Sequence, residues 1–103
     1  EAKGLYERAI SVLKRVKGKE PEQAITYLNL ASCAESELGL ENAQEIIEEN
    51  IERAMECLEQ SEDKVSGNYA FVCEKCAPTF RYYGYFSYAN ELETRARRIY
   101  EGS

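Results

Sequence analysis

Residues 76–96, CAPTFRYYGYFSYANELETRA, decide the fold of this chain. Apolar residues recur there at steps of three or four on both sides of a glycine: Cys76, Ala77 and Phe80 before Gly84, and Phe86, Ala89, Leu92 and Ala96 after it. Steps of this size place side chains on one face of an α-helix, and glycine is common where a helix ends. The stretch therefore predicts a helical hairpin, two antiparallel helices joined by a tight turn.

The same periodicity continues before this hairpin and predicts five helices in all. We expect them at about residues 2–17, 20–38, 41–60, 69–83 and 85–101. The pair Glu20-Pro21 marks the start of the second helix, since proline suits the first helical turn and an acidic residue favours the positive end of the helix dipole. Pro78 should remove one backbone hydrogen bond from the fourth helix and bend it. No stretch alternates with a period of two, so we expect an all-α fold.

The periodic residues also define the helix faces that should be buried. They are Leu5, Tyr6, Ala9, Ile10, Leu13 and Val16 in the first expected helix, and Ala43, Ile46, Ile47, Ile51, Ala54, Met55 and Leu58 in the third. The opposite faces of both helices are charged, which is typical of amphipathic helices with one side in water.

The composition fits one small domain that folds in water. The chain has 103 residues, of which 44% are hydrophobic and 31% are charged. No uncharged stretch approaches the length that a bilayer requires, so we expect no membrane partner. The formal net charge of -6 disfavours a nucleic-acid partner, because phosphate binding relies on a basic surface.

The sequence contains no histidine. This excludes Ser-His-Asp and Cys-His nucleophilic sites, histidine general bases, and zinc sites that mix histidine with cysteine. No carboxylate pair stands out as an acid–base couple, so we expect no enzyme activity, no catalytic residue, no cofactor and no metal. Because the chain begins at Glu1 and not at methionine, we expect a piece of a longer protein. Separately, we expect that protein to be cytoplasmic.

An internal repeat appears when the sequence is shifted by 46 positions. The shift aligns Leu30-Ala31 with Cys76-Ala77, Ala34 with Phe80, Ala43 with Ala89, and Ile46 with Leu92. Residues at these steps resemble the tetratricopeptide repeat (TPR), a helix-turn-helix unit of roughly 34 residues. The order of residue types is similar to that of the longer repeats in kinesin light chains and in many bacterial proteins. The resemblance implies antiparallel hairpins stacked as a short right-handed superhelix.

The resemblance covers nearly the whole chain as a single domain, with a half repeat at 1–18 and full repeats at 19–61 and 62–103. Two features depart from the pattern. Ala34 stands where a large aromatic residue is usual, and Arg53-Ala54 comes four residues later than its counterpart Arg95-Ala96. The first helix lacks a hairpin partner, so it either packs on the next hairpin or presents an apolar stripe that drives homodimer formation.

In the TPR family, the first helix of each hairpin lines a groove that binds an extended peptide of a partner protein. The resemblance therefore implies a peptide-binding face made of Leu28, Asn29, Ser32, Glu35 and Ser36 in one hairpin, and Glu74, Lys75, Pro78, Arg81 and Tyr82 in the other. Asn29 occupies a slot where family members often place an asparagine that bonds a peptide backbone. Lys75 and Arg81 suit an acidic side chain or a terminal carboxylate.

The four cysteines have two interpretations. Cys73-x-x-Cys76 with Cys33 and Cys57 has the ligand types of a zinc site, but only one close pair is present and it lies on an expected helix. Cys76 takes the place of Leu30 and Cys73 that of Tyr27 in the repeat, which favours packing in the core. The alternative functions are a redox element built on Cys73 and Cys76, and a regulatory or oligomerisation segment of a larger protein.

Four tyrosines cluster near the expected turn at Gly84. Tyr82 and Tyr85 have two open interpretations, an aromatic binding patch or packing at the helix-turn junction, whereas Tyr83 and Tyr88 favour packing.

Overall fold

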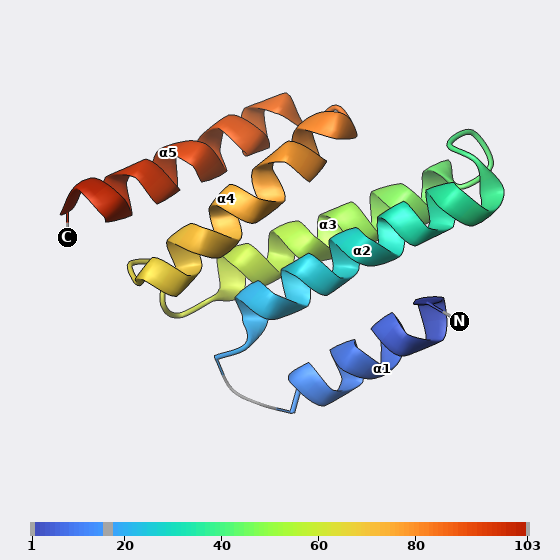
Figure 1. The fold of residues 1–103 in the computed structure, drawn as a ribbon, viewed down its shortest axis with the longest axis horizontal. Helices are drawn as coiled ribbons and strands as arrows, with labels where there is room; N and C mark the ends of the chain where they lie inside the picture. Colours follow the sequence, from blue (N-terminus) through green and yellow to red (C-terminus); the bar gives the residue numbers. More distant parts are fainter. Residues whose placement is uncertain (1, 16–17, 103) are drawn as a thin grey trace. The chain divides into compact units, whose positions relative to one another are not determined.

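The computed structural model describes residues 2–15 and 18–102, and within these ranges every regular element is an α-helix (Figure 1). The helices are α1 (Ala2–Leu13), α2 (Glu20–Leu38), α3 (Gln44–Gln60), α4 (Gly67–Tyr82) and α5 (Phe86–Gly102). The predicted all-α class and the five helices are therefore confirmed over the described part of the chain.

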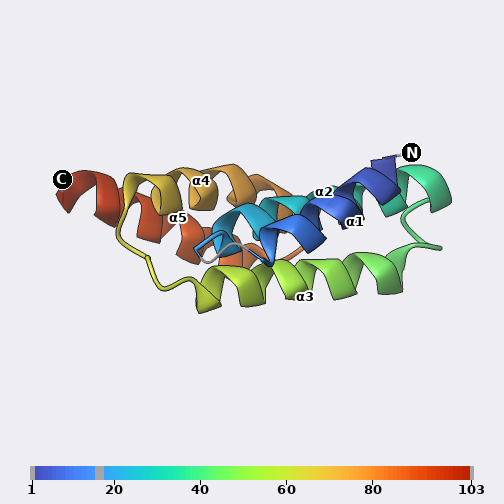
Figure 2. The ribbon, with the colours of Figure 1, turned by 90° about the horizontal axis from the view of Figure 1, so that it is seen from below.

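The chain divides into two compact units, Glu1–Ser61 and Glu62–Ser103. In the first unit, α2 packs against both α1 and α3, and each of these runs antiparallel to it (Figure 1, Figure 2). In the second unit, α4 and α5 pair along their lengths as an antiparallel hairpin. Each unit thus contains one of the two predicted hairpins.

Phe80 lies near the turn of the second hairpin, in the last turn of α4, and is fully buried. Its ring meets Tyr88 edge-on with the ring centroids 4.9 Å apart, and Tyr85 with the centroids 6.4 Å apart. The turn beneath it is tight: the Tyr85 N–H bonds the Phe80 carbonyl at 2.8 Å, and Gly84 adopts a φ of 93° that favours glycine. Near the other end of α4, Arg95 donates to the hydroxyl of the buried Tyr69 at 2.9 Å.

The first hairpin has a longer turn. The N–H of Gly39 closes α2 on the Glu35 carbonyl at 2.8 Å, and Gly39 takes a φ of 85°. Residues 40–43 then form turns, so α3 begins at Gln44, three residues later than predicted. The first helix ends at Leu13, before the predicted end at Lys17, and residues 16–17 lie outside the described ranges.

The start of α4 is set by two short polar side chains that sequence periodicity does not single out. Asp63 accepts the N–H groups of Val65 and Ser66, both at 3.0 Å, and these bonds lower the pKa of its carboxyl. Ser66 then accepts the N–H of Tyr69 at 3.1 Å and caps the helix. As a result α4 begins at Gly67, two residues before the predicted start, and it continues through Pro78 to Tyr82.

Several residues predicted to be buried are exposed instead, among them Leu5 at 63%, Ile46 at 40%, Phe86 at 59% and Tyr100 at 46%. Phe86 and Ile46 lie in the first turns of α5 and α3, at the turn end of each hairpin, where a paired helix gives less cover. Among the described helices α1 pairs closely with α2, which covers Ile10 and leaves Leu5 open. The predicted packing of Tyr6, Leu13 and Val16 lies outside the described side chains.

None of the described helices is both long enough and apolar enough to cross a membrane.

Replacing Phe80 with alanine should lower the free energy of unfolding by about 3–5 kcal/mol, because it removes a fully buried ring and leaves a cavity between α4 and α5 near their turn. Phe86→Ala is the matched control and should change stability little, since that ring is 59% exposed. Urea denaturation followed by circular dichroism measures both variants. Equal losses for the two variants would contradict the assignment of Phe80 as the core residue.

Candidate functional site

The predicted peptide-binding residues of the first hairpin lie along α2 and differ in exposure. Asn29, Ser32 and Ser36 are exposed, and Glu35 is partly buried. Their spacing of three and four places the exposed ones in a polar stripe on one face of the helix. Leu28 is only 4% exposed, so it belongs to the packed face of α2 and is not part of this stripe.

The predicted residues of the second hairpin lie along α4. Glu74, Lys75, Pro78 and Tyr82 are exposed, and Arg81 is partly exposed. Pro78 has no N–H to donate, yet α4 is helical on both sides of it. These side chains form a continuous surface of mixed charge and aromatic character.

Arg81 is already engaged within the hairpin. Its guanidinium donates to both carboxylate oxygens of Glu93, at 2.9 and 3.0 Å, and to the side-chain oxygen of Asn90 at 2.7 Å. The Glu93 carboxylate raises the pKa of Arg81, and the Arg81 guanidinium lowers that of Glu93. The planar Arg81 side chain, at one of the predicted peptide-binding positions, therefore also joins α4 to α5.

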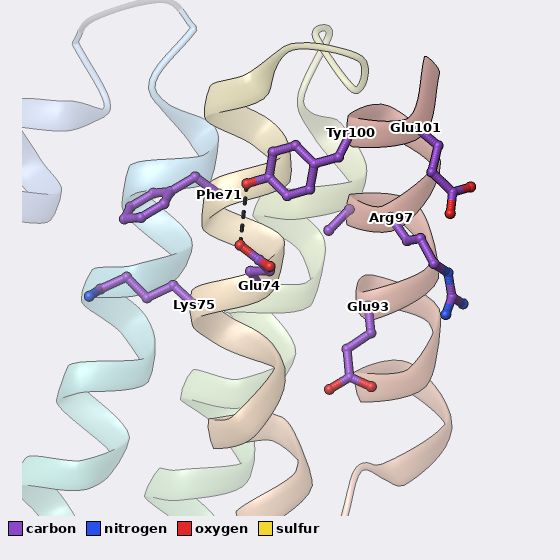
Figure 3. Close-up of a pocket in the computed structure, with 8 residues that line it drawn as sticks. Phe71, Glu74, Lys75, Glu93, Arg97, Tyr100 and Glu101 are labelled. Carbon is purple, nitrogen blue, oxygen red and sulfur yellow. Dashed lines mark hydrogen bonds between the residues drawn. The ribbon is translucent and has the colours of Figure 1, made fainter. Parts of the chain in front are cut away.

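A hollow of about 640 Å³ lies between α4 and α5 on the side of Glu74 and Lys75 (Figure 3). It is lined by Phe71, Glu74, Lys75, Glu93, Ala96, Arg97, Tyr100 and Glu101. The hydroxyl of Tyr100 donates to a Glu74 carboxylate oxygen at 3.2 Å, and the Lys75 amine lies 5.9 Å from the centre of the Phe71 ring. Partial burial, together with the negative charge of Glu74, raises the pKa of Tyr100.

Phe71 and Tyr100 are the unexpected members of this hollow, with exposures of 55% and 46%. The sequence offers a signal for Phe71, which falls out of step with the apolar face formed by Cys73, Cys76 and Phe80. The sequence does not indicate that Tyr100 is exposed, because its position in the apolar periodicity of α5 predicts a buried side chain. The arrangement combines two aromatic surfaces with charges of both signs, a combination that binds amphipathic groups.

The cysteines are free thiols, and Cys57, Cys73 and Cys76 are buried as predicted, whereas Cys33 is partly exposed. Burial raises the pKa of Cys57 to about 11 and that of Cys76 to about 12. The Cys57 thiol also points at the side-chain oxygen of Gln23, 3.8 Å away. Thiols with raised pKa values stay protonated at neutral pH and are poor nucleophiles. Within the described ranges, no group of three or more cysteine, aspartate or glutamate side chains is arranged to hold a metal ion.

The tyrosines near Gly84 separate into two roles. Tyr85 and Tyr88 pack edge-on against the buried Phe80. Tyr82 is 67% exposed and rests against the ring of Tyr83, with centroids 4.8 Å apart. Tyr85 therefore serves packing at the helix-turn junction, and Tyr82 belongs to the surface.

No family model, curated protein or solved structure matches this chain.

Iodoacetamide at about pH 8 should modify Cys33 rapidly in the folded chain and leave Cys57, Cys73 and Cys76 unmodified on the same timescale, because reaction requires an accessible thiolate. Peptide mass spectrometry assigns each modified site, and the unfolded chain in urea serves as the control in which all four react. Fast modification of Cys73 or Cys76 in the folded chain would contradict their burial and favour the redox alternative.

Proposed function

We propose that this chain is a protein-interaction module of the TPR type, which binds peptide segments of a partner protein at two separate surfaces, the exposed face of α2 in one unit and the exposed face of α4 in the other. It carries no catalytic group of its own in this proposal. The partner contacts the polar stripe of α2 through Asn29, Ser32 and Ser36, and the mixed surface of α4 through Glu74 and Lys75.

The internal repeat supports the family assignment. Three pairs of alanines separated by 46 positions have no exposed surface in either hairpin: Ala24 and Ala70, Ala31 and Ala77, and Ala43 and Ala89. Small side chains at fixed positions let neighbouring helices approach closely, which is what a repeated hairpin requires. The equivalent burial in both hairpins makes the repeat a feature of the packing as well as of the sequence.

The observation that carries the functional proposal is the hollow beside Glu74 and Lys75. Phe71 and Tyr100 expose about half of their surface there, next to charged side chains. Exposed aromatic residues that gather in one place are typical of surfaces that a partner covers, and aromatic residues are enriched in protein interfaces. The buried thiols of Cys57 and Cys76, whose pKa values burial raises to about 11 and about 12, are poor nucleophiles, so the proposal assigns them no chemistry.

The chemistry of the hollow defines the peptide. An apolar side chain of the partner fits against Phe71 and Tyr100, and an acidic side chain or terminal carboxylate next to it pairs with Lys75. The second contact is a charge-assisted hydrogen bond, which is about twice as strong as a neutral one. In the first hairpin, the side-chain amide of Asn29 offers a donor and an acceptor that suit a peptide backbone.

Selection from a random peptide library displayed on phage should enrich sequences that combine an apolar residue with an acidic one. The double variant Phe71→Ala/Lys75→Glu should bind the selected peptide at least about tenfold more weakly, because it removes an aromatic anchor and reverses a charge. Fluorescence polarisation with the labelled peptide measures the Kd.

The matched control is Glu45→Ala/Glu52→Ala, which changes two exposed residues of α3 in the other unit. It should leave the Kd unchanged, and circular dichroism checks that both double variants are folded. Peptides without a shared pattern, or equal Kd values for the folded Phe71→Ala/Lys75→Glu variant and the unmodified chain, would overturn the proposal.

A further inference from the structure

The first hairpin contains a hollow beside a small side chain, at the position where the second hairpin has a buried ring. Ala34 and Phe80 occupy corresponding positions in the repeat, and the Phe80 ring is fully buried between its neighbours. Ala34 has no ring to fill the same space and is only partly buried. A cavity of about 410 Å³ opens beside it, within the range of about 300–1,000 Å³ that is typical of binding pockets.

The hollow beside Ala34 has an apolar floor and apolar edges. Ile10 of α1 and Tyr27 and Leu30 of α2 form buried parts of its lining. Leu38 at the end of α2 and Ile46 at the start of α3 also line it, and they are 47% and 40% exposed. Ile46, which the periodicity places on a buried face, thus lies at the edge of this hollow and is open to water.

The rim of this hollow is acidic. Glu7, Glu37 and Glu49 line it, and Arg53 is the one basic residue among the described residues that do so. Arg53 is held in place already: it donates to Glu49 at 3.4 Å, and the hydroxyl of Tyr27 and the charge of Glu49 raise its pKa. One carboxylate is therefore neutralised, and the rim keeps a net negative charge.

We propose that the hollow beside Ala34 binds a basic, amphipathic segment of a partner protein, which inserts one large apolar side chain next to Ala34. Lysine or arginine residues on either side of that side chain face Glu7 and Glu37. A second copy of this chain fits the surface less well, because two copies each with a net charge of -6 repel one another.

This surface is distinct from the one proposed above, so the two proposals succeed or fail separately. The hollow uses Tyr27, Leu30 and Ala34 of α2, whereas the polar stripe uses Asn29 and Ser32 on another face of that helix. The peptides also have opposite charge: acidic for the α4 surface, and basic for the hollow.

The test uses a short fluorescein-labelled peptide with a central phenylalanine between lysine residues, and the whole chain as its target. Two further peptides serve as comparisons, one with alanine for the phenylalanine and one with glutamate for every lysine. Binding of the first peptide should exceed that of either comparison at least about tenfold. Equal binding of all three would overturn the proposal.

Ala34→Phe supplies the ring that the second hairpin has, and it should weaken binding of the lysine peptide at least about tenfold while keeping or raising the stability of the chain. Ser87→Phe is the matched control, since it adds the same ring at an exposed position of α5 and should leave binding unchanged. Undiminished binding by a folded Ala34→Phe variant would place the peptide elsewhere and overturn the proposal.

A second variant keeps the proposal testable if Ala34→Phe does not fold. Glu7→Lys/Glu37→Lys reverses the rim charge and should weaken the lysine peptide and strengthen the glutamate peptide. The bound lysine peptide should also slow iodoacetamide modification of Cys33, which lines the hollow.

Sedimentation of the unmodified chain and of Ala34→Phe tests whether a second copy occupies the hollow. A dimer of the unmodified chain that Ala34→Phe abolishes would identify a second copy as the occupant and overturn the assignment to a basic partner.

Discussion

A single amphipathic helix cannot bury its apolar face alone, and the structure depends on how each helix of this chain meets that constraint. In each hairpin the two helices bury their apolar faces against each other, and fully buried alanines lie on these faces. They include Ala31 and Ala43 in the first hairpin and Ala77 and Ala89 in the second. Small side chains at the packed faces let helices approach closely. Phe80 completes the second hairpin by filling the space beside its turn, and the rings of Tyr85 and Tyr88 close over it.

The chemical character of the two surfaces follows from what this packing leaves outside. Arg81 of α4 reaches Glu93 and Asn90 of α5 and is engaged within the hairpin. Glu74 and Lys75 lie on the surface and line the hollow together with Phe71 and Tyr100. The buried thiols of Cys57 and Cys76 are protonated at neutral pH because burial disfavours the thiolate.

The differences between the hairpins matter as much as the repeat. The turn after Gly39 is longer than the turn at Gly84, and Ala34 replaces the aromatic side chain that Phe80 provides. Both changes loosen the packing at the turn end of the first hairpin, where Leu38 and Ile46 are exposed. An imperfect repeat thus offers two unlike surfaces, one of mixed charge and the other apolar with an acidic rim.

The sequence by itself determined the helices of the described residues and the glycine at each hairpin turn. These properties are local, because periodicity and helix stops act within a few residues of the chain. The places of Cys57, Cys73 and Cys76 on apolar helix faces were also readable from the sequence, and the packing of the helices then buries them. Part of the candidate site was also predictable, since Asn29, Ser32, Glu74 and Lys75 lie on helix surfaces as expected.

Only the tertiary structure decided the pairing of Arg81 with Glu93, the exposure of Ile46 and Phe86, and the hollows beside Tyr100 and Ala34. The physical reason is that periodicity says which side of a helix is apolar, but not how far a neighbouring helix extends over it. That extent depends on turn length and on the size of side chains that are distant in the sequence.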